Sequence, residues 1–208
     1  MKRIPRRVTI LTGLVAAATL SCGPPGNPSA DETSDEALRV FSTLPPFTLT
    51  DQAGHAFGLE DLSGKVWVGN FIFTRCPGTC PVQTRYVKRL QEGLRDDPAW
   101  TQVRLVSFTV DPQYDTPDVL KEYAERIGAD PEHWFFLTGT REEIWQLSKD
   151  GFKMPVGDAP PGGDGPILHA TKLMLVDERG RLRGYYDGMT DEGLQELRRD
   201  LDLVLGDE

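Results

Sequence analysis

An apolar run that ends at two closely spaced cysteines constrains the fold more than any other feature of the chain. Residues 66–73 are apolar and rich in β-branched and aromatic side chains, which is typical of a buried strand. Two prolines and a glycine around Cys76 and Cys80 then break the strand. Pro81 suits the first position of a helix, because its missing N–H needs no partner there. Both sulfurs are therefore expected at or just before a helix N-terminus.

This position predicts reactive thiols. The partial positive charge of a helix N-terminus favours thiolate and can lower a cysteine pKa from roughly 8.5 to between about 3.5 and 7.5. Thiolate is the form that attacks disulfides and binds soft metals. A crosslink between Cys76 and Cys80 would close a very short loop and constrain little of the unfolded chain, which disfavours a purely structural role. The pair is interpreted as a redox-active disulfide or as part of a metal site.

The remaining elements alternate between strands and helices, which indicates an α/β fold. Expected strands cover residues 103–110, 134–137, 173–176 and 184–186, and expected helices cover residues 81–94, 116–127, 140–149 and 190–205. Residues 47–50 and 55–57 are expected to form an N-terminal β-hairpin. Together they predict a thioredoxin-like central mixed sheet flanked by helices. The cysteines then lie at the carboxyl edge of the sheet, where such folds bind ligands.

The first 22 residues have the pattern of an export signal. A basic start precedes an apolar stretch, residues 8–20, that is too short to span a bilayer in the usual way. Thr19-Leu20-Ser21-Cys22 resembles a bacterial lipoprotein box, in which Cys22 would be lipidated; an ordinary cleaved signal peptide and an uncleaved anchor are the alternatives. Residues 23–43 are expected to be a flexible tether, and residues 44–206 a single domain. The protein is therefore expected outside the cytoplasm, held at the membrane by an N-terminal lipid anchor.

The charge of the chain excludes one class of partner. Asp and Glu number 32 against 23 Lys and Arg, which gives a formal net charge of -9. Nucleic-acid binding depends on basic contacts to phosphate, so no nucleic-acid partner is expected. An acidic surface could instead help the protein to dock on a basic partner.

Of the three histidines, His169 is the candidate ligand, whereas His55 and His133 are expected at the surface. His169 follows a glycine- and proline-rich loop at residues 157–166 and precedes a strand. In a thioredoxin topology this loop faces Cys76 and Cys80 across the edge of the sheet. Two thiolates and one imidazole suit Cu(I), whereas zinc would normally need a fourth ligand, and none is evident. Oxidation of the two thiolates to a disulfide should release the metal.

Four segments of the chain stand out as an ordered set: Phe-Thr-Arg-Cys-Pro-Gly-Thr-Cys-Pro at 73–81, Thr-Val-Asp-Pro-Gln-Tyr-Asp-Thr-Pro at 109–117, Leu-Thr-Gly-Thr-Arg-Glu-Glu at 137–143, and His169 followed by Leu-Val-Asp at 175–177. In these segments the chain resembles the Sco (SenC) family of copper chaperones for cytochrome c oxidase assembly. The resemblance covers most of residues 44–205. It implies a membrane-tethered thioredoxin fold that binds copper through Cys76, Cys80 and His169. Leu168 departs from the family, because many members have aspartate there.

The resemblance also implies a role and partners. Its members help to build the CuA centre of cytochrome c oxidase subunit II, by delivering copper, by reducing that subunit's cysteines, or by both. Subunit II is thus the expected partner, with another periplasmic copper chaperone or a thioredoxin-like reductant as further candidates. Cu(I) is the expected cargo, and Cu(II) stays open.

Two questions stay open at this point. Asp111 and Asp115 either support the copper site or a docking surface, or simply form a turn and a helix cap. The main alternative function is a thiol–disulfide oxidoreductase that uses Cys76 and Cys80 without an obligatory metal. A thiol peroxidase is disfavoured, because its cysteine motif fits neither residue. A metallochaperone is favoured over a turnover enzyme.

Overall fold

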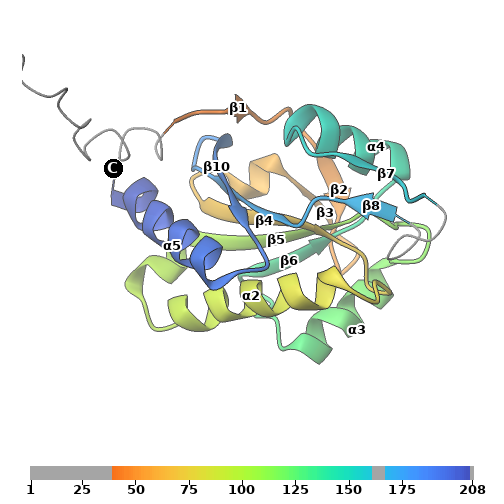
Figure 1. The fold of residues 1–208 in the computed structure, drawn as a ribbon, viewed down its shortest axis with the longest axis horizontal. Coiled ribbons are helices and arrows are strands. Elements are labelled where there is room, and N and C mark those ends of the chain that lie inside the picture. The colour runs from red at the N-terminus through yellow and green to blue at the C-terminus, as the bar shows by residue number, and fades with distance from the viewer. Residues whose placement is uncertain (1–38, 161–166, 207–208) are drawn as a thin grey trace, which may run out of the picture. The chain divides into compact units, whose positions relative to one another are not determined.

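The computed structural model of the protein describes residues 39–160 and 167–206 (Figure 1). The expected signal peptide with Cys22, the expected tether as far as residue 38, and residues 161–166 of the glycine- and proline-rich loop lie outside the described residues. Ser42–Thr43, the last two residues of the expected tether, form the short strand β1. In the ranges that are described, no helix is long and apolar enough to cross a membrane.

A six-stranded mixed sheet forms the centre of the domain. In spatial order its strands are β1 (Ser42–Thr43), β10 (Arg181–Asp187), β9 (Lys172–Val176), β4 (Val66–Ile72), β5 (Val103–Thr109) and β6 (Trp134–Leu137). The β4–β5 and β5–β6 pairs are parallel, and the other neighbours are antiparallel. The expected thioredoxin-like mixed sheet is confirmed.

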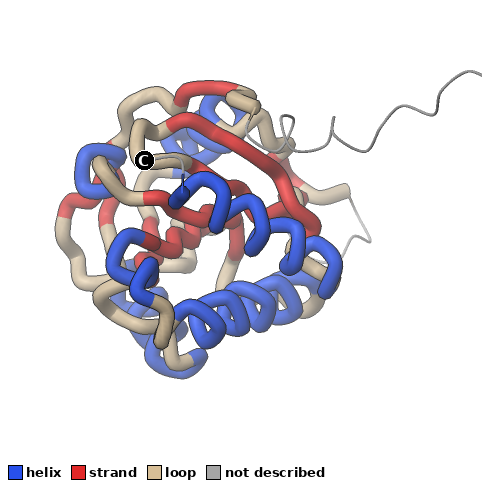
Figure 2. Tube along the Cα trace, turned by 90° about the vertical axis from the view of Figure 1, so that its left-hand side faces the viewer, coloured by secondary structure: helices blue, strands red, loops and turns tan. Residues whose placement is uncertain are grey.

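Helices cover both faces of this sheet. They are α2 (Thr79–Leu94), α3 (Pro117–Ile127), α4 (Arg141–Gln146), which continues into a π-helical turn at Leu147–Gly151, and α5 (Asp191–Gly206); two 3-10 turns lie at Leu59–Leu62 and Pro98–Gln102. Figure 1 shows α2 and α3 below the sheet, α4 above it, and α5 at the left, where it contacts α2. The tube in Figure 2 shows the strands as a layer between helices. Helix α2 lies in the crossover from β4 to β5, and α3 lies in the crossover from β5 to β6. Both crossovers have the same handedness and move in the same direction across the sheet, so α2 and α3 lie on the same face.

Sequence signals place two helix starts correctly. The Thr116 hydroxyl accepts a hydrogen bond from the Val119 N–H, and Thr140 and Glu143 form the reciprocal pair of a capping box. Helix α2 differs, because it begins at Thr79 rather than at Pro81. Proline is tolerated throughout the first turn, where the N–H groups have no partner within the helix. Cys80 therefore lies inside the first turn of α2.

Two hairpins lie outside the main sheet. The expected N-terminal hairpin is present as β2 (Thr48–Thr50) paired with β3 (Ala56–Gly58). The second was not expected: β7 (Val156–Asp158) pairs with β8 (Ile167–His169), with Val156 opposite His169. Its strands have three residues each and flank a segment rich in glycine and proline, a composition that indicates a loop. We call this pair of strands the histidine ribbon.

Strand β4, which leads to the cysteines, is buried at all seven positions. Within it, the Asn70 side chain donates to Gln83 Oε1 of α2 at 3.2 Å and accepts from the Ser107 hydroxyl of β5 at 2.7 Å. Gln83 in turn donates to the main-chain carbonyl of Lys172 in β9 at 3.2 Å. These buried hydrogen bonds hold α2 in a fixed position on three strands.

Candidate metal centre

His169 and Cys80 lie in contact although 89 residues separate them in the sequence. The His169 Nε2 atom is 3.2 Å from the Cys80 Sγ atom. The other ring nitrogen, Nδ1, lies 3.1 Å from the main-chain carbonyl oxygen of Ala170. Because that oxygen can only accept, Nδ1 carries the proton, and in the neutral ring Nε2 has a free electron pair facing the sulfur. This is the tautomer that a metal-binding imidazole needs at Nε2.

Cys76 lies beside Cys80 and is also a free thiol. Its sulfur accepts a hydrogen bond from the Cys80 N–H at 3.4 Å and lies 4.0 Å from the Thr79 hydroxyl. No group of three or more His, Cys, Asp or Glu side chains is assembled closely enough to hold a metal, as far as the described chain extends. The imidazole thus contacts only the Cys80 sulfur. The Cys76 sulfur lies nearby, but the three side chains do not form a preassembled metal site.

The donor atoms nevertheless fit a small soft cation. Sulfur and nitrogen bonded to one metal at about 2.0–2.3 Å and at trigonal or tetrahedral angles lie about 3.5–3.8 Å apart. The observed separation of 3.2 Å between Cys80 Sγ and His169 Nε2 needs only a small widening to admit an ion. Two sulfurs and one imidazole nitrogen match the soft, low-coordinate preference of Cu(I).

The two thiols differ in pKa, because burial and hydrogen bonding act on them to different extents. Burial strongly raises the pKa of the Cys80 thiol, and only 1 % of this residue is exposed. At Cys76 burial also acts to raise the pKa, but hydrogen bonds from the Cys80 and Gly78 N–H groups outweigh it, and the pKa is lowered. The expectation that the helix N-terminus lowers both values is therefore wrong for Cys80. Cys76 is the thiolate-prone member of the pair.

The imidazole is held in its neutral form. Burial lowers the pKa of His169, and the hydrogen bond to the Ala170 carbonyl offsets this only in part. The Phe73 ring meets the imidazole edge to face, with centroids 5.7 Å apart. Of the other two histidines, His55 is exposed beside Asp51, and His133 is partly buried and stacked on Trp100 at 4.3 Å. The surface expectation therefore holds for His55 and not fully for His133.

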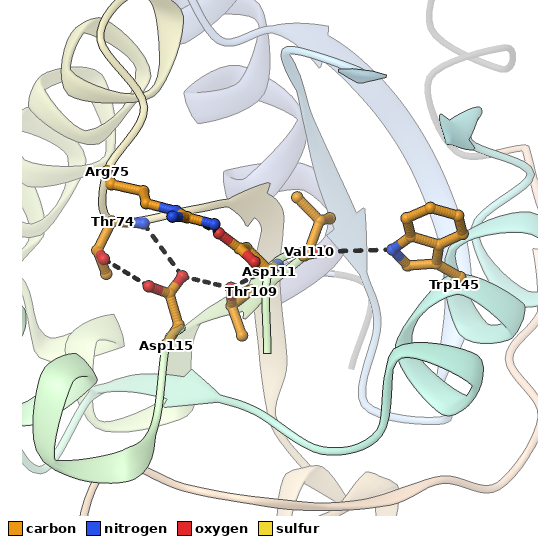
Figure 3. Close-up of polar contacts among 7 residues, drawn as sticks. All are labelled: Thr74, Arg75, Thr109, Val110, Asp111, Asp115 and Trp145. Carbon is orange, nitrogen blue, oxygen red and sulfur yellow. Dashed lines mark hydrogen bonds and ion pairs between the residues drawn. The ribbon is translucent and has the colours of Figure 1, made fainter. Parts of the chain in front are cut away.

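Asp115 follows strand β5 and links the end of that strand to residues 73–80, which we call the cysteine loop (Figure 3). Its buried carboxylate accepts hydrogen bonds from the Thr74 N–H at 3.1 Å and from the hydroxyls of Thr74 and Thr109, each at 2.5 Å. Burial raises the pKa of Asp115, against the effect of these hydrogen bonds. The helix cap is Thr116. Asp115 instead fixes the main chain two residues before Cys76.

Asp111 holds the next residue of the same loop. Its Oδ2 atom accepts from Arg75 Nε at 2.7 Å, and the Arg75 guanidinium lies 4.6 Å above the centre of the Tyr114 ring. Behind this turn, Trp145 of α4 donates to the Val110 carbonyl at 3.2 Å (Figure 3). Both aspartates therefore contact the residues that precede Cys76. Of the two alternatives that the sequence left open, support of the cysteine segment is the one that these contacts favour, although the hydrogen bonds themselves were not predictable.

The fold and the site together define a class of protein. A dithiol at the first main strand-to-helix junction of a thioredoxin-like sheet, with a buried neutral imidazole against one sulfur, is a centre for thiol chemistry, soft-metal binding or both.

Comparison with known proteins identifies the family. The SCO1/SenC family matches residues 36–202, and the chain therefore belongs to the Sco family. A SCO1/SenC family lipoprotein from Bacillus anthracis is 34% identical, with a TM-score of 0.72 over 79% of this chain and 95% of that one. BsSco, described as a Sco-family cytochrome c oxidase assembly protein with a disulfide switch, is 31% identical, with a TM-score of 0.71 over 82% and 98% of the two chains.

A third relative was solved with copper. ScoI from Bradyrhizobium japonicum, with copper bound, is 26% identical, with a TM-score of 0.65 over 78% of this chain and 99% of that one. The family to which the chain belongs is thus linked to cytochrome c oxidase assembly and includes members that bind copper.

Proposed function

We propose that the protein is a membrane-tethered, extracytoplasmic copper-binding assembly factor that serves the CuA site of cytochrome c oxidase subunit II. The observation that carries this proposal is the 3.2 Å contact between His169 Nε2 and Cys80 Sγ. A dithiol reductase needs no imidazole at this place, whereas a Cu(I) carrier gains a third soft-metal ligand from it. Membership of the Sco family and the copper-bound relative support the same function.

Copper is the cargo in this proposal, and the residues act on it in defined ways. Cys76 and Cys80 bind as thiolates, so uptake of Cu(I) by the reduced pair releases the thiol protons that the two residues still carry. His169 contributes the electron pair of Nε2 while its Nδ1–H stays hydrogen-bonded to Ala170. Transfer of two electrons from the pair to a disulfide of a redox partner forms one S–S bond between Cys76 and Cys80, reduces the partner's disulfide to two thiols, and eliminates both thiolate ligands. Metal affinity is therefore coupled to the redox state of the protein.

Titration of the reduced protein with Cu(I) tests the proposal. We expect a single Cu(I) per chain. Loss of a residue that merely hydrogen-bonds to a metal ligand lowers metal affinity by about 10–100-fold. His169→Ala removes a ligand itself, so we expect it to lower the Cu(I) affinity by more than about tenfold. His55→Ala is the matched control, since this exposed histidine lies in the N-terminal hairpin. Full copper affinity in His169→Ala, or an equal loss in His55→Ala, would remove His169 from the site.

A thiol–disulfide oxidoreductase is the second candidate function, and the unequal thiols favour it. A lowered pKa at Cys76 and a raised pKa at Cys80 are suited to an attacking thiolate and a resolving thiol. Such an enzyme should largely tolerate His169→Ala, whereas a chaperone should not. Rapid reduction of a generic disulfide by the metal-free protein would support this alternative, with subunit II or a thioredoxin-like protein as its redox partner.

The proposed anchor is a lipid on Cys22 after removal of residues 1–21. Support comes from the lipoprotein-box pattern and from the Bacillus anthracis relative, which is named a lipoprotein. In cells fed a labelled fatty acid, the wild-type chain should carry the label and sediment with membranes. Cys22→Ala should lose the label. A labelled Cys22→Ala chain would disprove lipidation at this residue.

A further inference from the structure

A pocket of about 360 Å³ lies between α2 and α3, directly beside the cysteine loop. Two of its lining residues, Thr74 and Pro81, bracket the cysteine pair in the sequence. Its other walls come from residues of α2 and α3, which Figure 1 shows on the same side of the sheet. A group bound in this pocket would therefore lie next to the chain segment that carries both sulfurs.

Three positive charges line this pocket, Arg85 and Lys88 from α2 and Arg126 from α3. Within residues 39–160 and 167–206, none of the three forms an ion pair with a carboxylate. Lys88 donates to the Gly128 carbonyl, and the Arg126 guanidinium lies 5.2 Å from the centre of the Tyr123 ring. Neither contact neutralises the positive charge of the side chain that makes it, so the pocket keeps three cationic groups at its wall.

Two hydroxyl groups add hydrogen-bonding capacity to the same pocket. Thr84 Oγ1 and Tyr123 Oη lie 2.8 Å apart, and both residues are buried and line the pocket. Each hydroxyl carries one hydrogen, and their mutual bond uses only one of the two. Burial raises the pKa of Tyr123, so the phenol keeps its proton. Cations together with a free hydroxyl donor match the chemistry of a carboxylate.

We propose that the pocket between α2 and α3 is a docking subsite for a carboxylate side chain in an acidic segment of the protein that exchanges copper or disulfide with Cys76 and Cys80. That the partner exchanges copper or disulfide rests on the proposed function. That the pocket binds a carboxylate does not. The net charge of -9 repels acidic proteins at long range. The pocket therefore acts at contact, where it orients a partner segment beside the sulfurs and adds specificity.

An NMR titration of the reduced, metal-free full chain tests the proposal. The probe is acetyl-Gly-Glu-Gly-Glu-Gly amide, and the same peptide with Lys in place of Glu is the negative probe. The acidic peptide should bind and shift the main-chain amide signals of Thr74, Arg85 and Tyr123. Arg85→Glu should weaken its binding about tenfold or more, since one charge-assisted contact is replaced by repulsion.

Lys121→Glu is the matched control, because Lys121 is an exposed cation of α3 that does not line the pocket. This control should bind the acidic peptide like the wild type. Absence of binding, or an equal loss in Lys121→Glu, would overturn the proposal. Binding of free succinate as tight as that of the peptide would identify a small-anion site and would overturn the assignment to a protein segment.

Copper titration of the same variants separates this proposal from the function proposed above. Arg85→Glu should keep full Cu(I) affinity but bind the acidic peptide more weakly. This result would support the pocket as the peptide site and would show that it acts independently of the metal ligands. Unchanged peptide binding in Arg85→Glu would refute the pocket and leave the copper proposal standing. Unchanged copper affinity in His169→Ala would refute the copper site and leave peptide binding to be judged on its own result.

Discussion

The two sides of the candidate metal centre are held in very different ways. The cysteine loop follows a strand that is buried at all seven positions, and the Asp115 carboxylate holds Thr74 through two hydrogen bonds. The histidine ribbon consists of two strands of three residues each outside the main sheet. An isolated two-stranded ribbon is only marginally stable. The centre thus combines a preorganised sulfur side with a more adaptable imidazole side.

This difference suits a protein that must both hold and release a metal ion. The ribbon buries Val156 and Ile167 beneath it but leaves Leu168 56% exposed. In the copper proposal, small movements of His169 would open or complete the ligand set, while the sulfurs stay in place. The comparison predicts that substitutions behind the cysteine loop cost stability, whereas substitutions on the ribbon change mainly local motion.

The largest effect is expected for Asp115→Ala. Removal of this carboxylate leaves the buried Thr109 hydroxyl and the half-buried N–H and hydroxyl of Thr74 without their acceptor. Unsatisfied buried groups cost about 1–3 kcal/mol each, and partial relaxation should keep the total loss at about 2–4 kcal/mol. Chemical denaturation measures this loss in the free energy of unfolding. Cu(I) affinity should fall with it, because the chain before Cys76 is no longer fixed.

Asp118→Ala is the control for this prediction, since Asp118 is an exposed acidic residue in the first turn of the neighbouring helix α3. It should lose only a few tenths of a kcal/mol. If Asp115→Ala is no more destabilised than Asp118→Ala, Asp115 does not hold the cysteine loop, and the contrast between the two sides of the centre is refuted.

The next effect concerns the two thiols. In the reduced, metal-free protein, iodoacetamide should alkylate Cys76 at least about tenfold faster than Cys80, because the thiolate reacts and only Cys76 has a lowered pKa. The rate at Cys76 should rise with pH through a midpoint below that of an ordinary cysteine thiol, and the midpoint at Cys80 should lie above it, because the pKa of Cys76 is lowered and that of Cys80 is raised. Mass spectrometry of timed samples distinguishes the sites. Equal rates would refute the unequal thiols and weaken the oxidoreductase alternative.

The order of elements was predictable because each carries a strong local signal. Thr116 with Pro117 and Thr140 with Glu143 mark helix starts through hydrogen bonds between residues close in the sequence. The apolar run before Cys76 likewise marks a buried strand. Such local signals, with the resemblance to the Sco family, were enough to predict the fold and to select Cys76, Cys80 and His169 as candidates.

The features that the sequence did not predict all depend on tertiary structure. The raised pKa of Cys80 follows from its burial beneath surrounding elements, which the helix-dipole argument ignores. The contact of Asp115 with Thr74 joins residues 41 positions apart. The pocket between α2 and α3 exists only once those helices lie side by side on the sheet. The histidine ribbon was hidden because Gly157 and the prolines that follow Asp158 indicate a loop.

The smallest effect is expected on the ribbon, for Asp158→Ala. Asp158 Oδ1 lies 3.2 Å from Arg141 Nη1, which links β7 to the start of α4, and its side chain is 74% exposed. Exposed ion pairs contribute little, so the free energy of unfolding should change by less than about 0.5 kcal/mol. Local opening of the ribbon should nevertheless increase, because this ion pair ties β7 to α4.

Amide hydrogen exchange measures that opening residue by residue. In Asp158→Ala, exchange should become faster at Val156 and His169, which pair across the ribbon, and should stay unchanged in β4. Asp150→Ala is the matched control, because Asp150 is an exposed acidic residue near α4 for which the described residues provide no ion-pair partner. Faster exchange in β4 as well as in the ribbon would mean that both sides of the centre open together, and the adaptable imidazole side would lose its physical basis.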